Sequence, residues 1–211
     1  YTINTTRIEA ITRAAIERVE RAADYSVLVA FDVSQLGKAA CADDGAELRN
    51  IVNRSGTVKN IVLRDEQLQQ VCAAFSEFMK AQAEPSPNPK GVPAKNDAIC
   101  FNVMTLVGKT YLEIGWKIGE DNTILIYSDL DGMLFDFLPS DIRDQSKATL
   151  QLSDGQRISQ YQGPAFSSPN VKTVAWTSDR YPLSMAFSIE TQAFNAWNQQ
   201  WVWLGYWFGG L

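Results

Sequence analysis

Three strand-like segments separated by short links occupy residues 98–128, and they constrain the fold more than any other part of the chain. Even-numbered residues of the segment 109–118 are mostly apolar and odd-numbered ones mostly polar, which is the period of a strand with one buried face. The segment 98–106 is almost continuously apolar, as in a central strand, and the segment 123–128 follows the turn formers of 119–122. Links this short join only antiparallel neighbours, so we predict a three-stranded meander at the centre of the fold.

The composition is that of a globular protein. The chain has 211 residues, 45% of them apolar and 20% charged, which is enough for one large domain or two small ones. Its net charge is −5 and its basic residues form no cluster, so we expect no nucleic-acid partner. The longest apolar run, Trp201 to Phe208, is far shorter than the roughly 20 residues of a membrane-spanning helix.

The chain contains no histidine. This excludes Ser-His-Asp and Cys-His nucleophilic systems and nearly all catalytic zinc sites. An enzyme of this composition would depend on carboxylates, lysine, tyrosine, cysteine or a hard metal, and we favour a non-enzymatic protein that needs no cofactor.

The three cysteines, Cys41, Cys72 and Cys100, have no CxxC spacing, so a structural zinc site is not indicated. Two alternatives stay open: one disulfide with three possible pairings, or three buried and reduced thiols. Because Cys100 lies in the apolar strand segment, we expect it to be buried.

The first part of the chain is predicted to be mainly helical. Thr5 or Thr6 can cap a helix that runs to about Ala23, and the apolar run 27–31 then indicates a buried strand over Tyr25–Val33. Asp43 or Asp44 begins a short helix, and a strand is predicted over Thr57–Leu63. A third helix is predicted to begin at Asp65, with an apolar stripe of Leu68, Val71, Phe75 and Phe78 or Met79.

Residues 84–97 are rich in proline, and neither a helix nor a central strand can continue through them. We interpret them as an exposed linker or surface loop within one domain that covers residues 1–211. A split into two units, 1–83 and 98–211, is the alternative, and a polyproline ligand for a partner is a further hypothesis for the same residues.

The last part of the chain is predicted to be mainly strands. A helical turn is expected at Ser140–Asp144, and a hairpin over Leu150–Ile158 has Asp154-Gly155 at its tip, a pair that favours a type I′ turn. Further strands are predicted at Val171–Thr177 and Leu183–Ile189. The fold class is therefore α+β, with N-terminal helices packed on a mainly antiparallel sheet.

The segment from Ile124 to Asp136 ends an apolar strand in Asp129-Leu-Asp131-Gly-Met-Leu. It resembles the first motif of the haloacid dehalogenase superfamily of phosphatases over about a dozen residues. The resemblance implies that Asp129 is a nucleophile, that Asp131 is a general acid/base, and that both hold Mg²⁺ on a fold of parallel strands. Met133 stands where that family has threonine, the motif begins late in the chain, and the segments after it are hairpins, so we do not assign the chain to this family. An acidic turn after a strand explains the same residues.

The C-terminal segment is strongly aromatic and has no charge after Glu190. Neither a helix nor a strand can place all of its rings on one side, so some of them are expected to contact a membrane interface, a glycan, a partner protein or a second copy of the chain. The alternative is that the segment docks on the protein's own sheet. The candidate binding residues are Trp197, Trp201, Trp203, Tyr206, Trp207 and Phe208.

The sequence begins at Tyr1 rather than methionine, and Asn4 and Asn53 fit the N-glycosylation pattern, so we predict a secreted or periplasmic protein. Our functional prediction is a non-enzymatic binding, toxin-like or self-assembling protein that engages a membrane, glycan or protein surface through the aromatic segment. The alternatives are a magnesium-dependent aspartyl phosphatase and an acidic inhibitor or immunity-type protein.

Overall fold

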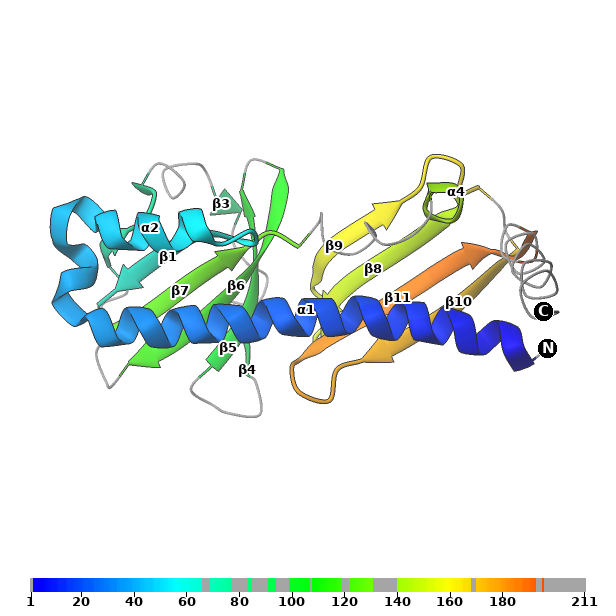
Figure 1. Ribbon diagram of the computed structural model, residues 1–211, viewed down its shortest axis with the longest axis horizontal. Coiled ribbons are helices and arrows are strands. Elements are labelled where there is room, and N and C mark those ends of the chain that lie inside the picture. Colours follow the sequence, from blue (N-terminus) through cyan, green and yellow to red (C-terminus); the bar gives the residue numbers. More distant parts are fainter. Residues whose placement is uncertain are drawn as a thin grey trace, which may run out of the picture.

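The protein consists of one long helix laid along two antiparallel sheets, as a computed structural model of the chain shows (Figure 1). The structure describes residues 2–65, 69–76, 83–84, 91–93, 99–106, 108–118, 122–130, 140–167, 170–192 and 195. The predicted α+β class is confirmed, because the helices lie early in the chain and all strand pairs in the described residues are antiparallel.

Helix α1, Thr2–Leu36, is the long helix, and it continues through the residues for which a strand was predicted. The prediction of a strand over Tyr25–Val33 is therefore wrong. Positions spaced alternately four and three residues apart are buried along the whole helix, and this spacing continues through the supposed strand. The run 27–31 also contains Leu28, which is 61% exposed, because a helix turns that side chain away from the sheet. The positions with this spacing are Ile8, Thr12, Ala15, Val19, Ala22, Ser26, Val29 and Val33, and Ile16, Ala23 and Ala30 beside them are also buried.

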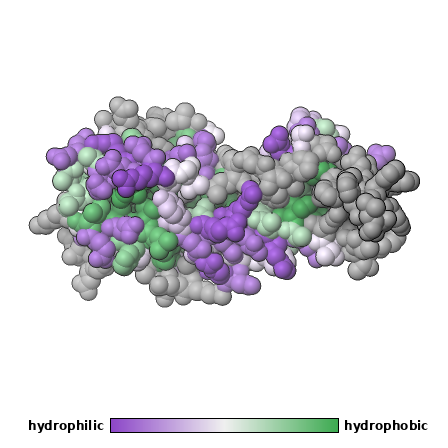
Figure 2. Space-filling model, in the orientation of Figure 1, coloured by the Kyte–Doolittle hydropathy of each residue, from purple (hydrophilic) through white to green (hydrophobic). Residues whose placement is uncertain are grey.

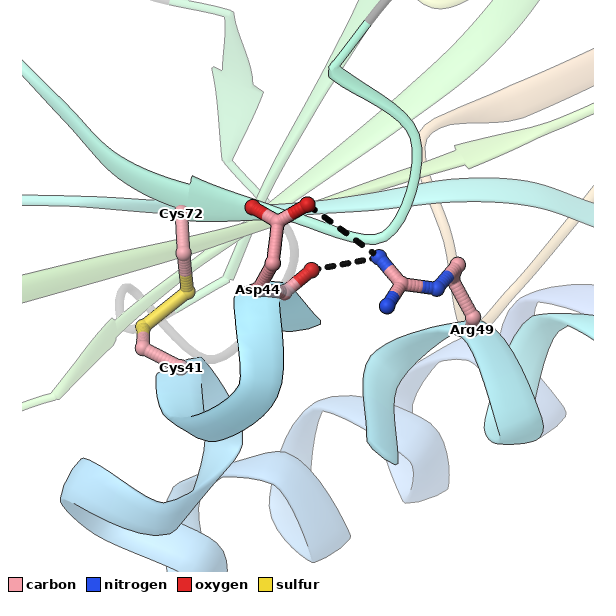
Figure 3. Close-up of a disulfide and its surroundings, with 4 residues drawn as sticks. All are labelled: Cys41, Asp44, Arg49 and Cys72. Atoms are coloured by element: carbon pink, nitrogen blue, oxygen red, sulfur yellow. Dashed lines mark hydrogen bonds and ion pairs between the residues drawn. A yellow bond between two sulfur atoms is a disulfide. The ribbon is translucent and has the colours of Figure 1, made fainter. Parts of the chain in front are cut away.

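A tight 3-10 segment, Gly37–Gly45, follows α1 and leads into α2, Ala46–Arg54. The short helix expected from Asp43 or Asp44 thus begins later, because both aspartates and Gly45 have left-handed backbone conformations. Only glycine fits at Gly45, where a Cβ atom would lie 2.7 Å from the carbonyl oxygen of Ala73. Arg49 of α2 donates a hydrogen bond to the carbonyl oxygen of Asp44 (Figure 3). It also donates to the carbonyl oxygen of Asp43, so it holds this turn in place.

The first sheet has the strand order β2-β1-β7-β6-β5-β3, and β4 also pairs with β5. The predicted meander is confirmed as β5, β6 and β7, and the strand predicted after Gly56 is confirmed as β1. The strand β5 is not central, since among the described strands only the short β3 and β4 pair with its outer side. The strands are β1 Val58–Arg64, β2 Gln70–Ala73, β3 Ala83–Glu84, β4 Val92–Pro93, β5 Ile99–Leu106, β6 Lys109–Ile118 and β7 Asn122–Ser128.

Strand β2 replaces the first part of the helix predicted from Asp65, so that helix is wrong over residues 70–73. Asp65 does accept a hydrogen bond from a backbone N–H, that of Gln69 at 2.8 Å, but this bond closes a turn. Pairing of β2 with β1 outweighs the local helical spacing. The other stripe residues Leu68, Phe78 and Met79 lie outside the described residues, as do most of 84–97.

The second sheet has the order β10-β11-β8-β9 and follows α4, Ser140–Asp144, where the predicted helical turn is confirmed. The predicted hairpin and strands are also confirmed, but the hairpin turn is not type I′, because only Gly155 has a positive φ, of 90°. Its N–H donates to the carbonyl oxygen of Leu152, as in a type I turn closed by a left-handed glycine. The strands are β8 Ser146–Leu152, β9 Arg157–Gln162, β10 Val171–Thr177 and β11 Leu183–Glu190.

Helix α1 joins the two sheets through the hydrophobic core. One buried cluster contains Ile8 to Ala23 of α1 together with side chains of β5, β6, β8, β9 and β11. A second cluster contains Val29 and Val33 of α1 with side chains of α2, β1 and β7. Each of the two clusters thus contains residues from both 1–83 and 98–211, and the choice between one domain and two stays a prediction.

Candidate functional site

A row of four polar side chains crosses the face of the first sheet that is turned away from α1. We call this face the far face. The residues are register partners on β1, β7, β6 and β5, namely Asn60, Tyr127, Glu113 and Asn102. Side chains of the neighbouring positions point to α1 and α2 instead and form the apolar core.

The row is withdrawn from solvent. Asn60 and Tyr127 are fully buried, and Glu113 and Asn102 are half-buried. The Asn60 side chain has a structural role. It accepts a hydrogen bond from the backbone N–H of Phe75 at 3.0 Å and donates one to the carbonyl oxygen of Phe75 at 3.1 Å. The amide of Asn102 donates to the Glu113 carboxylate at 3.4 Å, a long bond. Because Glu113 is only half-buried, its carboxylate can accept hydrogen bonds from groups that a ligand brings.

The hydroxyl group of Tyr127 stays protonated. Burial first, and the charge of the neighbouring Glu113 second, raise the pKa of Tyr127 well above its ordinary value of 10, against the opposing charge of Arg64. Tyr127 therefore keeps a neutral and fully buried O–H group beside the Glu113 carboxylate.

Beside this row, Gly115 stands between Leu125 and Cys100 in the adjacent row of register partners. A Cβ atom at Gly115 would lie 3.3 Å from a methyl group of Leu125, so the Leu125 side chain already covers this glycine and a larger residue would have to displace it. Glycine within a strand is typical of a place where another group approaches the backbone closely. Cys100 is half-buried here rather than buried as expected, because its side chain lies on this face and not on the core face.

The acidic turn is held by a lysine. Asp129 lies 2.5 Å from the ammonium group of Lys109, and its backbone N–H donates to the carbonyl oxygen of Thr57 at 3.0 Å. Asp131 lies outside the described residues, so the Asp129–Asp131 pair stays a sequence-based hypothesis. Within the described ranges no group of three or more Cys, Asp or Glu side chains could hold a metal ion. The antiparallel order of β5, β6 and β7 also differs from the parallel strands that the phosphatase resemblance implies.

A disulfide joins Cys41 of the 3-10 segment to Cys72 of β2 and leaves Cys100 as a free thiol (Figure 3). Of the alternatives left open, one disulfide is thus the one observed. A groove of about 430 Å³ runs beside it, lined by Val33, Leu63, Val71 and Ile118 with Ser34 and Asn122. Figure 2 shows hydrophobic side chains gathered over the adjoining half of α1, where Leu28 and Phe31 are exposed.

The other residues singled out in the sequence are not brought into this site. The aromatic binding residues from Trp197 to Phe208 lie outside the described part of the chain. Asn4 lies in α1, and Asn53 is exposed near the end of α2. Sequence reasoning missed Asn60, Asn102, Glu113 and Tyr127 as a group because only the register between strands aligns them, although Asn102 was a polar residue within an apolar run.

Comparison with known proteins gives the fold alone. No protein-family model matches the chain, and no curated protein matches it. The arrangement of one long helix along two antiparallel sheets is shared with the periplasmic domain of RsbU from Chlamydia trachomatis, a structure known at 1.7 Å resolution. The TM-score is 0.58 at 10% sequence identity, over 92% of this chain and 95% of that one. None of the helices in the described residues is long and apolar enough to cross a bilayer.

Proposed function

We propose that the chain is an extracytoplasmic sensory domain that binds a small polar molecule on the far face of its first sheet. The observation that carries this proposal is the row Asn60, Tyr127, Glu113 and Asn102, which places a carboxylate and a neutral phenol among buried neighbours. A few polar side chains that converge among buried apolar neighbours are typical of small-molecule binding sites.

Two further observations support the location. The shared fold is that of a domain described as periplasmic. The Cys41–Cys72 disulfide is also typical of oxidising compartments, since cytosolic thiols are kept reduced.

The site chemistry indicates the class of ligand. Glu113 accepts hydrogen bonds, and Arg64 and Lys117 lie in a parallel row on the same face, four residues further along β1 and β6. A small molecule with hydroxyl or amino donors fits Glu113 best, and an acidic group on the same molecule would be attracted by the two basic side chains.

The test is a binding screen with the full chain. Amino compounds, polyols and hydroxy acids are tested first by the shift in melting temperature and then by calorimetry. A ligand of this site should lose about tenfold or more in affinity in Glu113→Gln, because a hydrogen bond to a charged group contributes about 1.5–3 kcal/mol. Tyr127→Phe should weaken binding less, since it removes a neutral group. Glu47→Gln on the exposed face of α2 is the matched control and should bind normally.

Loss of binding in Glu47→Gln, or unchanged binding in Glu113→Gln, would contradict the assignment of the site. Circular dichroism of each variant separates a lost contact from a lost fold.

The aromatic segment from Trp197 to Phe208 supports a second proposal at the level of sequence, namely that it engages a membrane, glycan or protein surface. The magnesium phosphatase and the acidic inhibitor remain alternative hypotheses, and the first of them is open to the direct test of Asp129 described below.

A further inference from the structure

A segment of α1 about two turns long, from Glu20 to Ser26, carries polar contacts to both sheets. Glu20 and Asp24, which are four residues apart and so share one side of the helix, bind the turn between β10 and β11. Two residues later Ser26 enters the core on another side of α1, and its hydroxyl group lies 3.1 Å from that of Ser128 at the end of β7.

Side chains of the turn between β10 and β11 form hydrogen bonds with this part of α1. The hydroxyl oxygen of Ser178 accepts the backbone N–H groups of Arg180 and Tyr181 at 3.1 and 3.0 Å, and its proton is donated to Glu20. The Tyr181 hydroxyl donates to Asp24 at 2.6 Å, and Arg180 forms an ion pair with the same carboxylate. These bonds fix the turn to α1 from both of its ends.

Tyr181 also reaches the first sheet directly. Its ring packs on Phe101 of β5, with the ring centroids 5.3 Å apart. Tyr181 is therefore in contact with α1, with the first sheet and with its own second sheet.

The two residues of the first sheet that make these contacts, Ser128 and Phe101, are each adjacent in sequence to a residue of the far-face row. Ser128 follows Tyr127 on β7, and Phe101 precedes Asn102 on β5. Adjacent residues of a strand point to opposite faces, so a backbone displacement at Tyr127 or Asn102 also displaces the residue that contacts Ser26 or Tyr181. Packed interiors transmit such displacements rather than absorb them.

We propose that the segment of α1 from Glu20 to Ser26, together with Tyr181, couples the far face of the first sheet to the β10–β11 hairpin of the second sheet. The inference rests on the proposed function for its biological meaning, because it supplies the route by which occupancy of that site changes the second sheet. The coupling itself is a property of the fold and can be measured without a ligand.

The experiment uses Glu113→Gln as the perturbation and amide hydrogen exchange of the full chain as the readout. We expect Glu113→Gln to change exchange in residues 183–189 of β11 by about threefold or more, since local opening reports contacts between structural units. The same substitution made in a Tyr181→Phe or an Asp24→Asn background should leave exchange in β11 unchanged. Thr173→Ala is the control background, because Thr173 bonds Ser188 at an exposed position of the second sheet and does not belong to the coupling contacts.

An unchanged β11 in the otherwise wild-type chain would overturn the inference, as would a response that persists in either the Tyr181→Phe or the Asp24→Asn background. If the binding screen finds no ligand, the proposed function is contradicted, but β11 should still change its hydrogen exchange in Glu113→Gln. The two failures can therefore be told apart.

Discussion

Ser26 of α1 and Ser128 of β7 meet inside the core with their hydroxyl oxygens 3.1 Å apart, although 102 residues separate them in the sequence. Ser26 also donates to the carbonyl oxygen of Ala22 at 2.9 Å, so a hydroxyl group in the apolar stripe of α1 has its hydrogen bonds satisfied. The pair aligns the long helix with the strand that carries Tyr127, which apolar packing alone does not specify as closely.

Ser128→Ala should destabilise the protein by about 0.5–1.5 kcal/mol, the usual net value of one hydrogen bond. Ser26→Leu should cost more, about 1–3 kcal/mol, because the larger side chain does not fit between α1 and β7. Urea unfolding measures both values. Ser188→Ala, which removes the exposed bond to Thr173, is the control and should stay within about 0.5 kcal/mol of wild type. Equal losses in Ser128→Ala and Ser188→Ala would show that the buried pair has no special role.

Tyr181 should make stability depend on pH in the alkaline range. Burial first, and then the hydrogen bond and charge of Asp24, raise the pKa of Tyr181 from its ordinary 10 to about 12, against the opposing charge of Arg180. A raised pKa means that folding favours the protonated phenol, so this contribution is complete below about pH 10 and is lost as the pH rises to about 12. The other charged group near Tyr181 is the Glu20 carboxylate, which accepts a hydrogen bond from the Ser178 hydroxyl group.

The measurement is urea unfolding of wild type and Tyr181→Phe at several pH values between about 8 and 12. Other groups titrate in both proteins, so the difference between the two free energies of unfolding isolates Tyr181. The free energy of unfolding of wild type minus that of Tyr181→Phe should be constant up to about pH 10 and should then decrease as the pH rises. A difference that does not change with pH would contradict the proposed environment of this phenol.

Several elements could be predicted from the sequence because their signals are local. The alternation in β6 and the Asp154-Gly155 pair each lie within a few residues, and both gave the correct strands. The continuation of α1 beyond Ala23 was missed because the run 27–31 is apolar in sequence, whereas the helix separates its buried residues from the exposed Leu28.

The remaining misses depend on contacts between distant residues. Strand β2 exists because it pairs with β1, and Cys72 in it is joined to Cys41 of a different element. The far-face row needs the register of four strands, in which Asn60 is paired with Tyr127. No spacing within one segment indicates such a row, which is why the sequence pointed to the acidic turn and the aromatic segment instead.

The disulfide should contribute substantially to stability. Cys41 and Cys72 are 31 residues apart, and closing a loop of that length corresponds to about 3–4 kcal/mol in the chain-entropy account. The double variant Cys41→Ser/Cys72→Ser should therefore melt well below wild type, and a reductant should lower the melting temperature of wild type only. Cys100→Ser is the control, since its thiol is free, and it should respond to reductant as wild type does. A wild type insensitive to reductant under conditions that fully reduce it would contradict this prediction.

The aromatic segment should bind a surface outside the fold through Trp203, Tyr206 and Trp207, while Trp197 and Trp201 dock on the protein. Burying one aromatic side chain contributes about 1.5–3 kcal/mol, so a few rings are enough to anchor the segment. Vesicles should shift tryptophan emission of the full chain to the blue, and the double substitution Trp203→Ala/Trp207→Ala should remove the shift and leave the melting temperature within a few degrees of wild type. Trp116, which packs on Phe31, and Trp176, which lies under Arg13, provide a constant background. If a soluble quencher reached all indoles of the isolated protein equally poorly, this interpretation would be wrong.

Substitution of Asp129 tests whether the acidic turn after β7 has a structural or a catalytic role. The Asp129 side chain is 14% exposed and forms an ion pair with Lys109, whose side chain is 46% exposed. The pair lies where β6 begins and β7 ends. A carboxylate held in this way supports the turn after β7, and we expect the protein to show no magnesium-dependent hydrolysis of p-nitrophenyl phosphate. Asp129→Asn should lower the free energy of unfolding by about 0.5–1 kcal/mol, and Lys109→Gln should do the same, because each removes one member of a partly exposed pair. The double variant should lose little more than either single one, since both substitutions break the same interaction. Turnover that requires Mg²⁺ and disappears in Asp129→Asn would instead establish the aspartate as a nucleophile, and additive losses in the double variant would show that the ion pair does not form in solution.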